Sequence, residues 1–201
     1  MKKYEIMKLK FHRTVQNSTH YTKYVLKTNM DDQLLADCAR EFQSTLQLKD
    51  KQVECLNYVL SGRDVIANLP VGYGKSIIYQ LLPLLMKKKG LPKHVVLVLS
   101  PLNIIQEEQI RFLDGHGVTA CRLPYTDEGT ELDINGIVNG KYSVVFAHPE
   151  ALLNTDCGKS LLHETSFIDV VAAVAVDECH IVEEWYVYKA TVFNYCIFGE
   201  P

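Results

Sequence analysis

Residues 69–76, which read Leu-Pro-Val-Gly-Tyr-Gly-Lys-Ser, combine the residue types that bind phosphate groups. Glycines let the backbone curl so that successive N–H groups point at phosphate oxygens. A helix that starts directly after such a loop adds positive partial charge at its N-terminus. Lys75 would then reach the terminal phosphates of a nucleotide, and the hydroxyl of Ser76 would bind Mg²⁺. The alternative is a glycine-rich turn with an exposed lysine.

A pair of acids, Asp177 and Glu178, follows the apolar run 170–176. At the end of a strand, the first carboxylate can hold Mg²⁺ through water, and the second can polarise an attacking water or accept its proton. Taken alone, the pair also fits a turn at a strand exit, with His180 capping the next helix. Downstream of a phosphate-binding loop, however, it occupies the place that the second half of a P-loop ATPase site requires.

Alternating strands and helices are predicted from residue 50 onward. Fully apolar strands separated by helices favour an α/β fold with a parallel sheet covered on both faces. We expect Pro83 to kink or shorten the helix that follows the glycine-rich loop. The strands are expected at 64–68, 95–99, 143–147 and 170–176, with a weaker one at 118–123, and the helices at 50–60, 76–86 and 103–113.

Three polar signals follow strands in this scheme: residues 72–76, Ser100-Pro101 and Asp177-Glu178. In open α/β sheets, ligands bind at the carboxyl ends of the strands. We therefore expect the three signals to meet at one edge of the sheet.

Composition limits the class of protein further. The chain has 201 residues, 47% of them hydrophobic, and a net charge of -3, so it is the size of one domain and any nucleic-acid contact must come from a local surface. Its six cysteines include no C-x-x-C pair and no cluster with zinc-ligand spacing. The N-terminus lacks an apolar signal region, and no apolar run approaches the roughly 18 residues of a membrane span. We expect an intracellular protein with reduced thiols.

With these motifs in place, the sequence resembles the RecQ family of DNA helicases, a branch of helicase superfamily 2, over about residues 48–185. Residues 48–52 resemble the family's motif whose glutamine recognises adenine, which implies that Gln52 contacts the base and that Lys49 flanks it. Residues 69–76 resemble the Pro-Thr-Gly-x-Gly-Lys-Ser form of Walker A, which needs no first glycine, although Val71 replaces the threonine. The resemblance implies nucleotide contacts from Gly72, Tyr73, Gly74, Lys75 and Ser76, with Mg²⁺ on Ser76 and Asp177.

Further motifs of the family extend the resemblance toward nucleic acid. Residues 99–102 look like motif Ia and residues 147–150 like the Pro-Glu segment, which implies strand contacts from Ser100, Pro101 and His148. The sequence Asp-Glu-Cys-His at 177–180 is similar to the D-E-x-H box. Trp185 stands where the family's aromatic-rich loop carries a tryptophan that couples DNA binding to hydrolysis. The catalytic residues implied are Lys75, Asp177, Glu178 and His180.

After Trp185 the resemblance fades, and neither motif III nor a second lobe with arginine fingers is recognisable before Pro201. We therefore expect an N-terminal extension at 1–30, loose or disordered, a RecA-like ATP-binding domain at 31–185 and a divergent tail at 186–201. The resemblance implies the ATP-binding lobe of a 3′–5′ DNA helicase, truncated before its second lobe, that uses ATP and Mg²⁺ on single-stranded or forked DNA. A nuclear location follows if the source is a eukaryote.

Two alternatives stay open at this point. The chain could be a catalytically inactive module, derived from such a helicase, that binds nucleic acid or protein. It could also be an RNA helicase lobe of the same superfamily, because the D-E-C-H sequence does not separate DNA from RNA. A Rossmann dinucleotide site is disfavoured, since no G-x-G-x-x-G follows the first strand.

Overall fold

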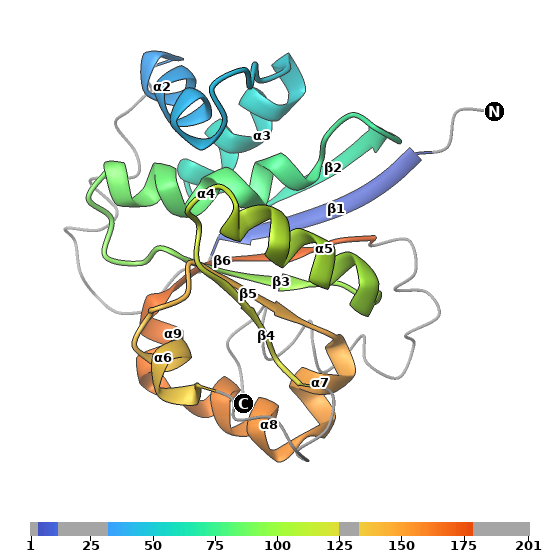
Figure 1. Ribbon diagram of the computed structural model, residues 1–201, viewed down its shortest axis with the longest axis vertical. Coiled ribbons are helices and arrows are strands. Elements are labelled where there is room, and N and C mark those ends of the chain that lie inside the picture. The colour runs from blue at the N-terminus through green and yellow to red at the C-terminus, as the bar shows by residue number, and fades with distance from the viewer. Residues whose placement is uncertain (1–3, 12–31, 125–132, 179–201) are drawn as a thin grey trace.

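A computed structural model of the chain describes residues 4–11, 32–124 and 133–178. Six strands form one sheet in the order β2-β1-β6-β3-β5-β4 (Figure 1). The strands are β1 (Tyr4–Phe11), β2 (Val65–Pro70), β3 (Val95–Leu99), β4 (Ala120–Arg122), β5 (Val144–Ala147) and β6 (Val171–Val176).

The predicted parallel sheet is confirmed for four strands, because β6, β3, β5 and β4 pair in parallel. Strand β1 differs, since it pairs antiparallel with β2 on one side and with β6 on the other. It was not predicted, and it comes from the segment expected to be loose. The alternation of Met7, Leu9 and Phe11 in the sequence is the period-2 signal that marks it.

Helices cover both faces of the sheet, as predicted. The helices on one face are α2 (Asp32–Phe42), α3 (Asp50–Leu60), α4 (Ser76–Lys88) and α5 (Asn103–Asp114), and those on the other are α6 (Ile134–Val138), α7 (Pro149–Asn154), α8 (Asp156–His163) and α9 (Thr165–Val170) (Figure 1). Successive side chains of β3 divide between the two cores: Val96 and Val98 join the first, while Val95, Leu97 and Leu99 join the second. This two-sided burial explains why the strand is apolar at every position.

Helix α4 runs through Pro83 to Lys88, so the expected shortening is wrong. Proline removes one backbone hydrogen bond, but Pro83 and its neighbours Leu81, Leu82 and Leu85 are buried against the sheet. Burial of a long aliphatic side chain is worth about 1.5 to 3 kcal/mol, which offsets the roughly 3 kcal/mol cost of an internal proline.

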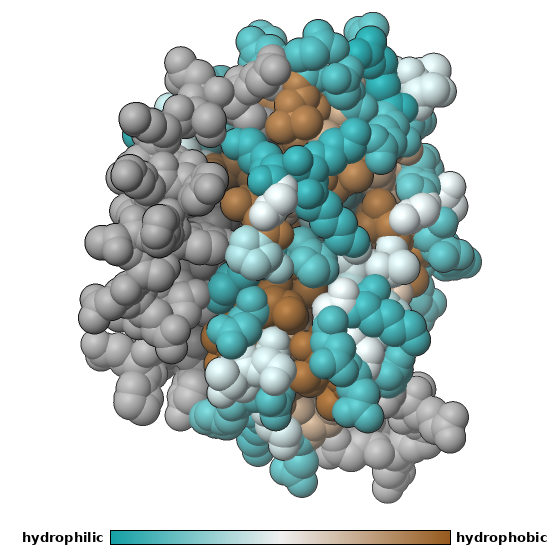
Figure 2. All heavy atoms as spheres, turned by 90° about the vertical axis from the view of Figure 1, so that its left-hand side faces the viewer, coloured by the Kyte–Doolittle hydropathy of each residue, from teal (hydrophilic) through white to brown (hydrophobic). Residues whose placement is uncertain are grey.

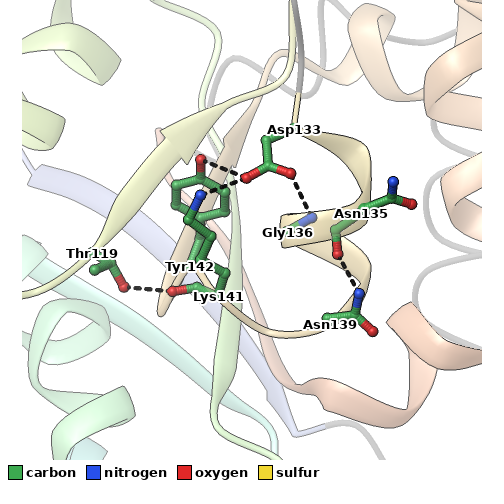
Figure 3. A network of polar contacts seen from close by, with 7 residues as sticks. All are labelled: Thr119, Asp133, Asn135, Gly136, Asn139, Lys141 and Tyr142. Atoms are coloured by element: carbon green, nitrogen blue, oxygen red, sulfur yellow. Dashed lines mark hydrogen bonds and ion pairs between the residues drawn. The ribbon is translucent and has the colours of Figure 1, made fainter.

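Helix α6 is tied to the segment before β5 by Asp133. This carboxylate caps the helix by accepting a hydrogen bond from Gly136 N at 2.8 Å, and it pairs with Lys141 Nζ at 2.6 Å (Figure 3). Thr119 Oγ1 donates to the Lys141 carbonyl at 3.0 Å. The network links the entrance of β4 to the entrance of β5, at the opposite edge of the sheet from the glycine-rich loop.

The surface seen from the side of α6 and α9 is mostly hydrophilic, with apolar atoms visible in narrow strips between polar ones (Figure 2). Among the helices that the structure describes, none is both long and apolar enough to cross a membrane.

Candidate functional site: a phosphate loop facing an acidic pair

The glycine-rich loop lies between the end of β2 and the start of α4. Gly72 and Gly74 have φ angles of 75° and 88°, in the left-handed region that favours glycine. Tyr73 N donates to the Pro70 carbonyl at 3.0 Å, which folds the loop back on the strand. The loop therefore wraps the N-terminus of a 13-residue helix, where backbone N–H groups have no partner within the helix.

Lys75 lies between the two acids that the sequence analysis singled out. Its Nζ is 3.5 Å from Asp177 Oδ1 and 3.5 Å from Glu178 Oε1, and the three side chains are 4%, 8% and 17% exposed. Residues about 100 positions apart are thus brought together at the carboxyl edge of the sheet. At 3.5 Å the contacts are long for charged hydrogen bonds, which ordinarily measure about 2.7 to 2.9 Å.

The acidic pair is held in a tight turn. Asp177 N donates to the Leu99 carbonyl at 2.9 Å and so extends the ladder between β6 and β3 by one residue. Glu178 has a φ of 51°, and its N–H donates to Asp177 Oδ1 at 3.0 Å. A non-glycine residue in this region costs about 1 to 3 kcal/mol, and such residues cluster at functional sites.

Two side chains at the start of α3, Lys49 and Gln52, donate hydrogen bonds to the glycine-rich loop. Gln52 Nε2 donates to the carbonyls of Tyr73 and Gly74 at 3.0 and 2.9 Å, and its Oε1 accepts from Lys49 N at 2.8 Å. Lys49 Nζ donates to the Tyr73 carbonyl at 2.9 Å and lies 4.6 Å from the centre of the Tyr73 ring. Both residues were expected at the base of a nucleotide, and their hydrogen bonds to the loop itself were not predicted.

Tyr79 was missed by sequence reasoning. It lies one turn beyond Ser76 on α4, and its hydroxyl donates to Gln109 Oε1 on α5 at 3.3 Å. Burial, and to a smaller degree the charge of Asp177, holds the pKa of Tyr79 well above its ordinary value. The protonated hydroxyl therefore fastens the first turn of α4 to α5. The spacing Ser76-Tyr79 on one helix face is the signal that could have found it.

Of the residues expected to contact nucleic acid, Ser100, Pro101 and His148 lie where β3 and β5 end. Ser100 N donates to the Ala147 carbonyl at 3.1 Å, and His148 caps α7 by accepting from Glu150 N at 3.3 Å. Burial lowers the pKa of His148. Ser100 is only 1% exposed, so its hydroxyl lies beneath the surface, whereas Pro101 is half-buried.

Leu102 and Ile104 are exposed large hydrophobic side chains beside this cluster, and Ile104 is 79% exposed. Sequence reasoning did not assign Ile104 a role. The remaining predicted residues, His180 and Trp185, lie outside the described residues.

Within 4–11, 32–124 and 133–178, no group of three or more His, Cys, Asp or Glu side chains is placed to hold a metal ion. A hydroxyl and a carboxylate are nevertheless oxygen donors of the kind that Mg²⁺ prefers, and Mg²⁺ is commonly held by one or two protein ligands together with substrate phosphates. Ser76 and Asp177 fit such a donor set.

A phosphate loop at a helix N-terminus, facing an acidic pair across a sheet covered by helices on both sides, defines a P-loop nucleotide-binding domain of the RecA-like kind. The chain belongs to the DEAD/DEAH box helicase family, whose model matches residues 49–196.

Individual relatives show which type of helicase the chain is similar to. The chain is 30% identical over 139 residues to the ATP-dependent helicase SGS1 of Saccharomyces cerevisiae, covering 68% of this chain and 10% of that protein. It is 31% identical over 152 residues to the bifunctional 3′-5′ exonuclease/ATP-dependent helicase WRN of Mus musculus, covering 74% and 10%. It is 27% identical over 136 residues to the ATP-dependent DNA helicase RecQ of Haemophilus influenzae, covering 67% and 20%. The chain thus spans a tenth to a fifth of the length of these relatives, and its homology to RecQ-type helicases is shown.

Proposed function

We propose that this chain is the ATP-binding lobe of a RecQ-like 3′–5′ DNA helicase that couples ATP hydrolysis to DNA unwinding. The observation that carries the proposal is the buried contact of Lys75 with Asp177 and Glu178 at the N-terminus of α4. The names of the relatives, which include ATP-dependent helicases and a DNA helicase, support the same reaction and substrate.

The residues divide the chemistry between them. Lys75 leaves the carboxylates to bind the terminal phosphates, while Gly72, Tyr73 and Gly74 present backbone N–H groups to them. Water attacks the γ-phosphorus, the bond to the bridging oxygen breaks, ADP leaves, and Glu178 accepts the proton from the water. Ser76 and Asp177 would hold Mg²⁺, which would offset negative charge on the phosphate oxygens. We assign His180 to the same catalytic group.

Base recognition falls to Gln52 and Lys49. In the present arrangement the side-chain amide of Gln52 donates two hydrogen bonds, both to carbonyls of the loop. Adenine binding by Gln52 therefore shifts or shares these hydrogen bonds, which connects the base directly to the phosphate loop.

Single-stranded or forked DNA is proposed to cross the surface where β3 and β5 end, through Ser100, Pro101, His148 and Trp185. Ser100 is buried, and its backbone N–H and C=O bond to Ala147 and to Gln106 Nε2, so we propose that it acts by positioning its neighbours on this surface. Ile104, exposed on the first turn of α5, offers an apolar contact to a base. With a net charge of -3, the chain gains affinity from this local surface and not from bulk attraction.

Unwinding needs a second lobe, because in this family the arginines that stabilise the transferring phosphoryl group come from there. Such an arginine is worth about 10³ to 10⁵ in rate. Residues 1–201 alone are expected to bind ATP weakly and to unwind DNA little or not at all. If the source is a eukaryote, we propose that the protein acts in the nucleus.

The test is Mg²⁺-dependent binding of a fluorescent ATP analogue to the purified chain and to Lys75→Ala. Lys141→Ala is the matched control, since Lys141 is a surface lysine paired with Asp133 at the opposite edge of the sheet from the loop. We expect Lys75→Ala to weaken binding at least tenfold and Lys141→Ala to leave it unchanged. DNA binding that persists while the wild-type chain ignores ATP would instead identify a non-catalytic binding module.

A further inference from the structure

Strand β1 lies between the two strands that lead into the halves of the proposed nucleotide site. Strand β2, which leads into the phosphate loop, lies at the edge of the sheet, and in the described part of the chain its only partner strand is β1. Strand β6, which leads into the acidic pair, pairs with β1 and β3. Every ladder hydrogen bond that links the loop to the acids therefore passes through residues 4–11.

The register of β1 sets how far apart the two halves lie. Lys8 stands opposite Ile66 in β2 and opposite Val176 in β6, so these two residues share one level of the sheet. A slip of β1 by two residues against β2 keeps the same side chains facing the core and moves β2 along its axis by about 7 Å. The contacts between Lys75 and the two acids are 3.5 Å long, so such a slip would separate them.

Neither neighbour of β1 holds this register through a tight turn. Strand β2 begins 54 residues after Phe11, and β6 begins about 160 residues after it. The register depends instead on side-chain packing, and Met7 supplies it. Its side chain is fully buried in the core that contains Ala67, its directly opposite residue in β2, and Leu56 of α3.

We propose that residues 4–11 are a positioning segment for nucleotide binding: by holding β2 and β6 in register, β1 aligns the phosphate loop with the acidic pair. The inference rests on the proposed ATP-binding function. It assigns a role at the site to an N-terminal segment that contributes no ligand to the nucleotide.

Disulfides that fix the register of the full chain test this. Directly opposite residues have Cα atoms about 4.5 to 5.5 Å apart, within disulfide range, whereas residues offset by two lie about 7 to 8 Å apart. Met7→Cys with Ala67→Cys therefore locks the native register, and Met7→Cys with Val65→Cys locks a register slipped by two residues. Peptide mass mapping identifies each bond among the six native cysteines.

We expect the native-register disulfide to form and, while the bond is intact, to leave binding of the fluorescent ATP analogue within twofold of the wild-type chain. Any cross-linked fraction of the slipped pair should bind at least tenfold more weakly than the cross-linked native-register pair. Absence of the slipped disulfide under oxidation also supports a fixed register.

Two results overturn the proposal: failure of the native-register disulfide to form, or a slipped, cross-linked chain that binds the analogue as well as the wild type. Both are distinct from failure of the proposed function, in which the wild-type chain itself binds no ATP analogue.

Discussion

Gly72 and Gly74 adopt similar backbone conformations for different physical reasons. A Cβ atom added at Gly72 would meet nothing within 4 Å, so only its φ of 75° opposes a side chain. At Gly74 the same atom would lie 2.8 Å from Gln52 Nε2, the amide that holds the loop. Gly72 is therefore favoured only by its positive φ angle, whereas Gly74 is favoured by its positive φ angle and by the close approach of the Gln52 side chain.

Alanine substitutions should separate the two effects. We expect Gly72→Ala to lower the free energy of unfolding by about 1 to 2 kcal/mol, the cost of a left-handed non-glycine residue. Gly74→Ala should cost more and also weaken ATP-analogue binding, because it displaces Gln52. Urea unfolding and analogue titration measure both. Equal effects of the two substitutions would show that the Gln52 contact is unimportant.

The sequence predicted which residues lie together better than it predicted their contacts. Lys75, Asp177 and Glu178 could be placed together because each follows a strand of the same parallel sheet. The bonds of Gln52 to loop carbonyls could not be predicted, because they depend on how α3 packs beside the loop. The pairing of Tyr79 with Gln109 depends in the same way on the packing of α4 against α5.

Among the elements, helix α8 starts at a polar cap on which two helices depend. Thr155 Oγ1 accepts from Gly158 N at 2.9 Å and donates to the Ala151 carbonyl at 2.6 Å, so one hydroxyl joins the start of α8 to the preceding α7. The residue is buried, so water cannot replace either partner.

We expect Thr155→Ala to destabilise the protein by about 1 to 2 kcal/mol, since it removes a helix cap and leaves a buried carbonyl with one partner fewer. Thr155→Ser keeps the hydroxyl and should lose less than half as much. Chemical denaturation of both variants provides the measurement, and ATP-analogue affinity should be unaffected because α8 lies on the far face from the loop. A serine variant as unstable as the alanine variant would exclude the hydroxyl as the cause.

The elements most evident in the sequence were the fully apolar strands, which are buried on both faces. Strand β1 was missed because it is charged at several positions and separated from its partners by long stretches of chain. At Pro83 the prediction was wrong for another reason. The low helix propensity of proline predicts a break or kink, but the burial of α4 outweighs that propensity and the helix continues.

For the molecule as a whole, nucleotide binding should appear as global stabilisation. Because ATP would bind the folded chain and not the unfolded one, a ligand concentration of 100 Kd adds about 2.7 kcal/mol. For a domain of this size that raises Tm by about 5 to 11 °C. Differential scanning calorimetry with Mg²⁺ and ATP should show the shift in the wild-type chain and none in Lys75→Ala. A comparable shift in Lys75→Ala would place the ATP elsewhere.

The antiparallel strand β1 also has a consequence for the order in which the protein is made. On the ribosome, β1 emerges first, but its partner β6 follows about 160 residues later, which at about 5 to 20 residues per second is a delay of about 8 to 32 s. During that interval β1 can pair only with β2, and its other edge is a row of unsatisfied N–H and C=O groups open to neighbouring nascent chains. During synthesis this domain therefore exposes an unpaired strand edge that a chaperone could cover. Slow codons placed between β2 and β6 would lengthen that exposure and should lower the soluble yield.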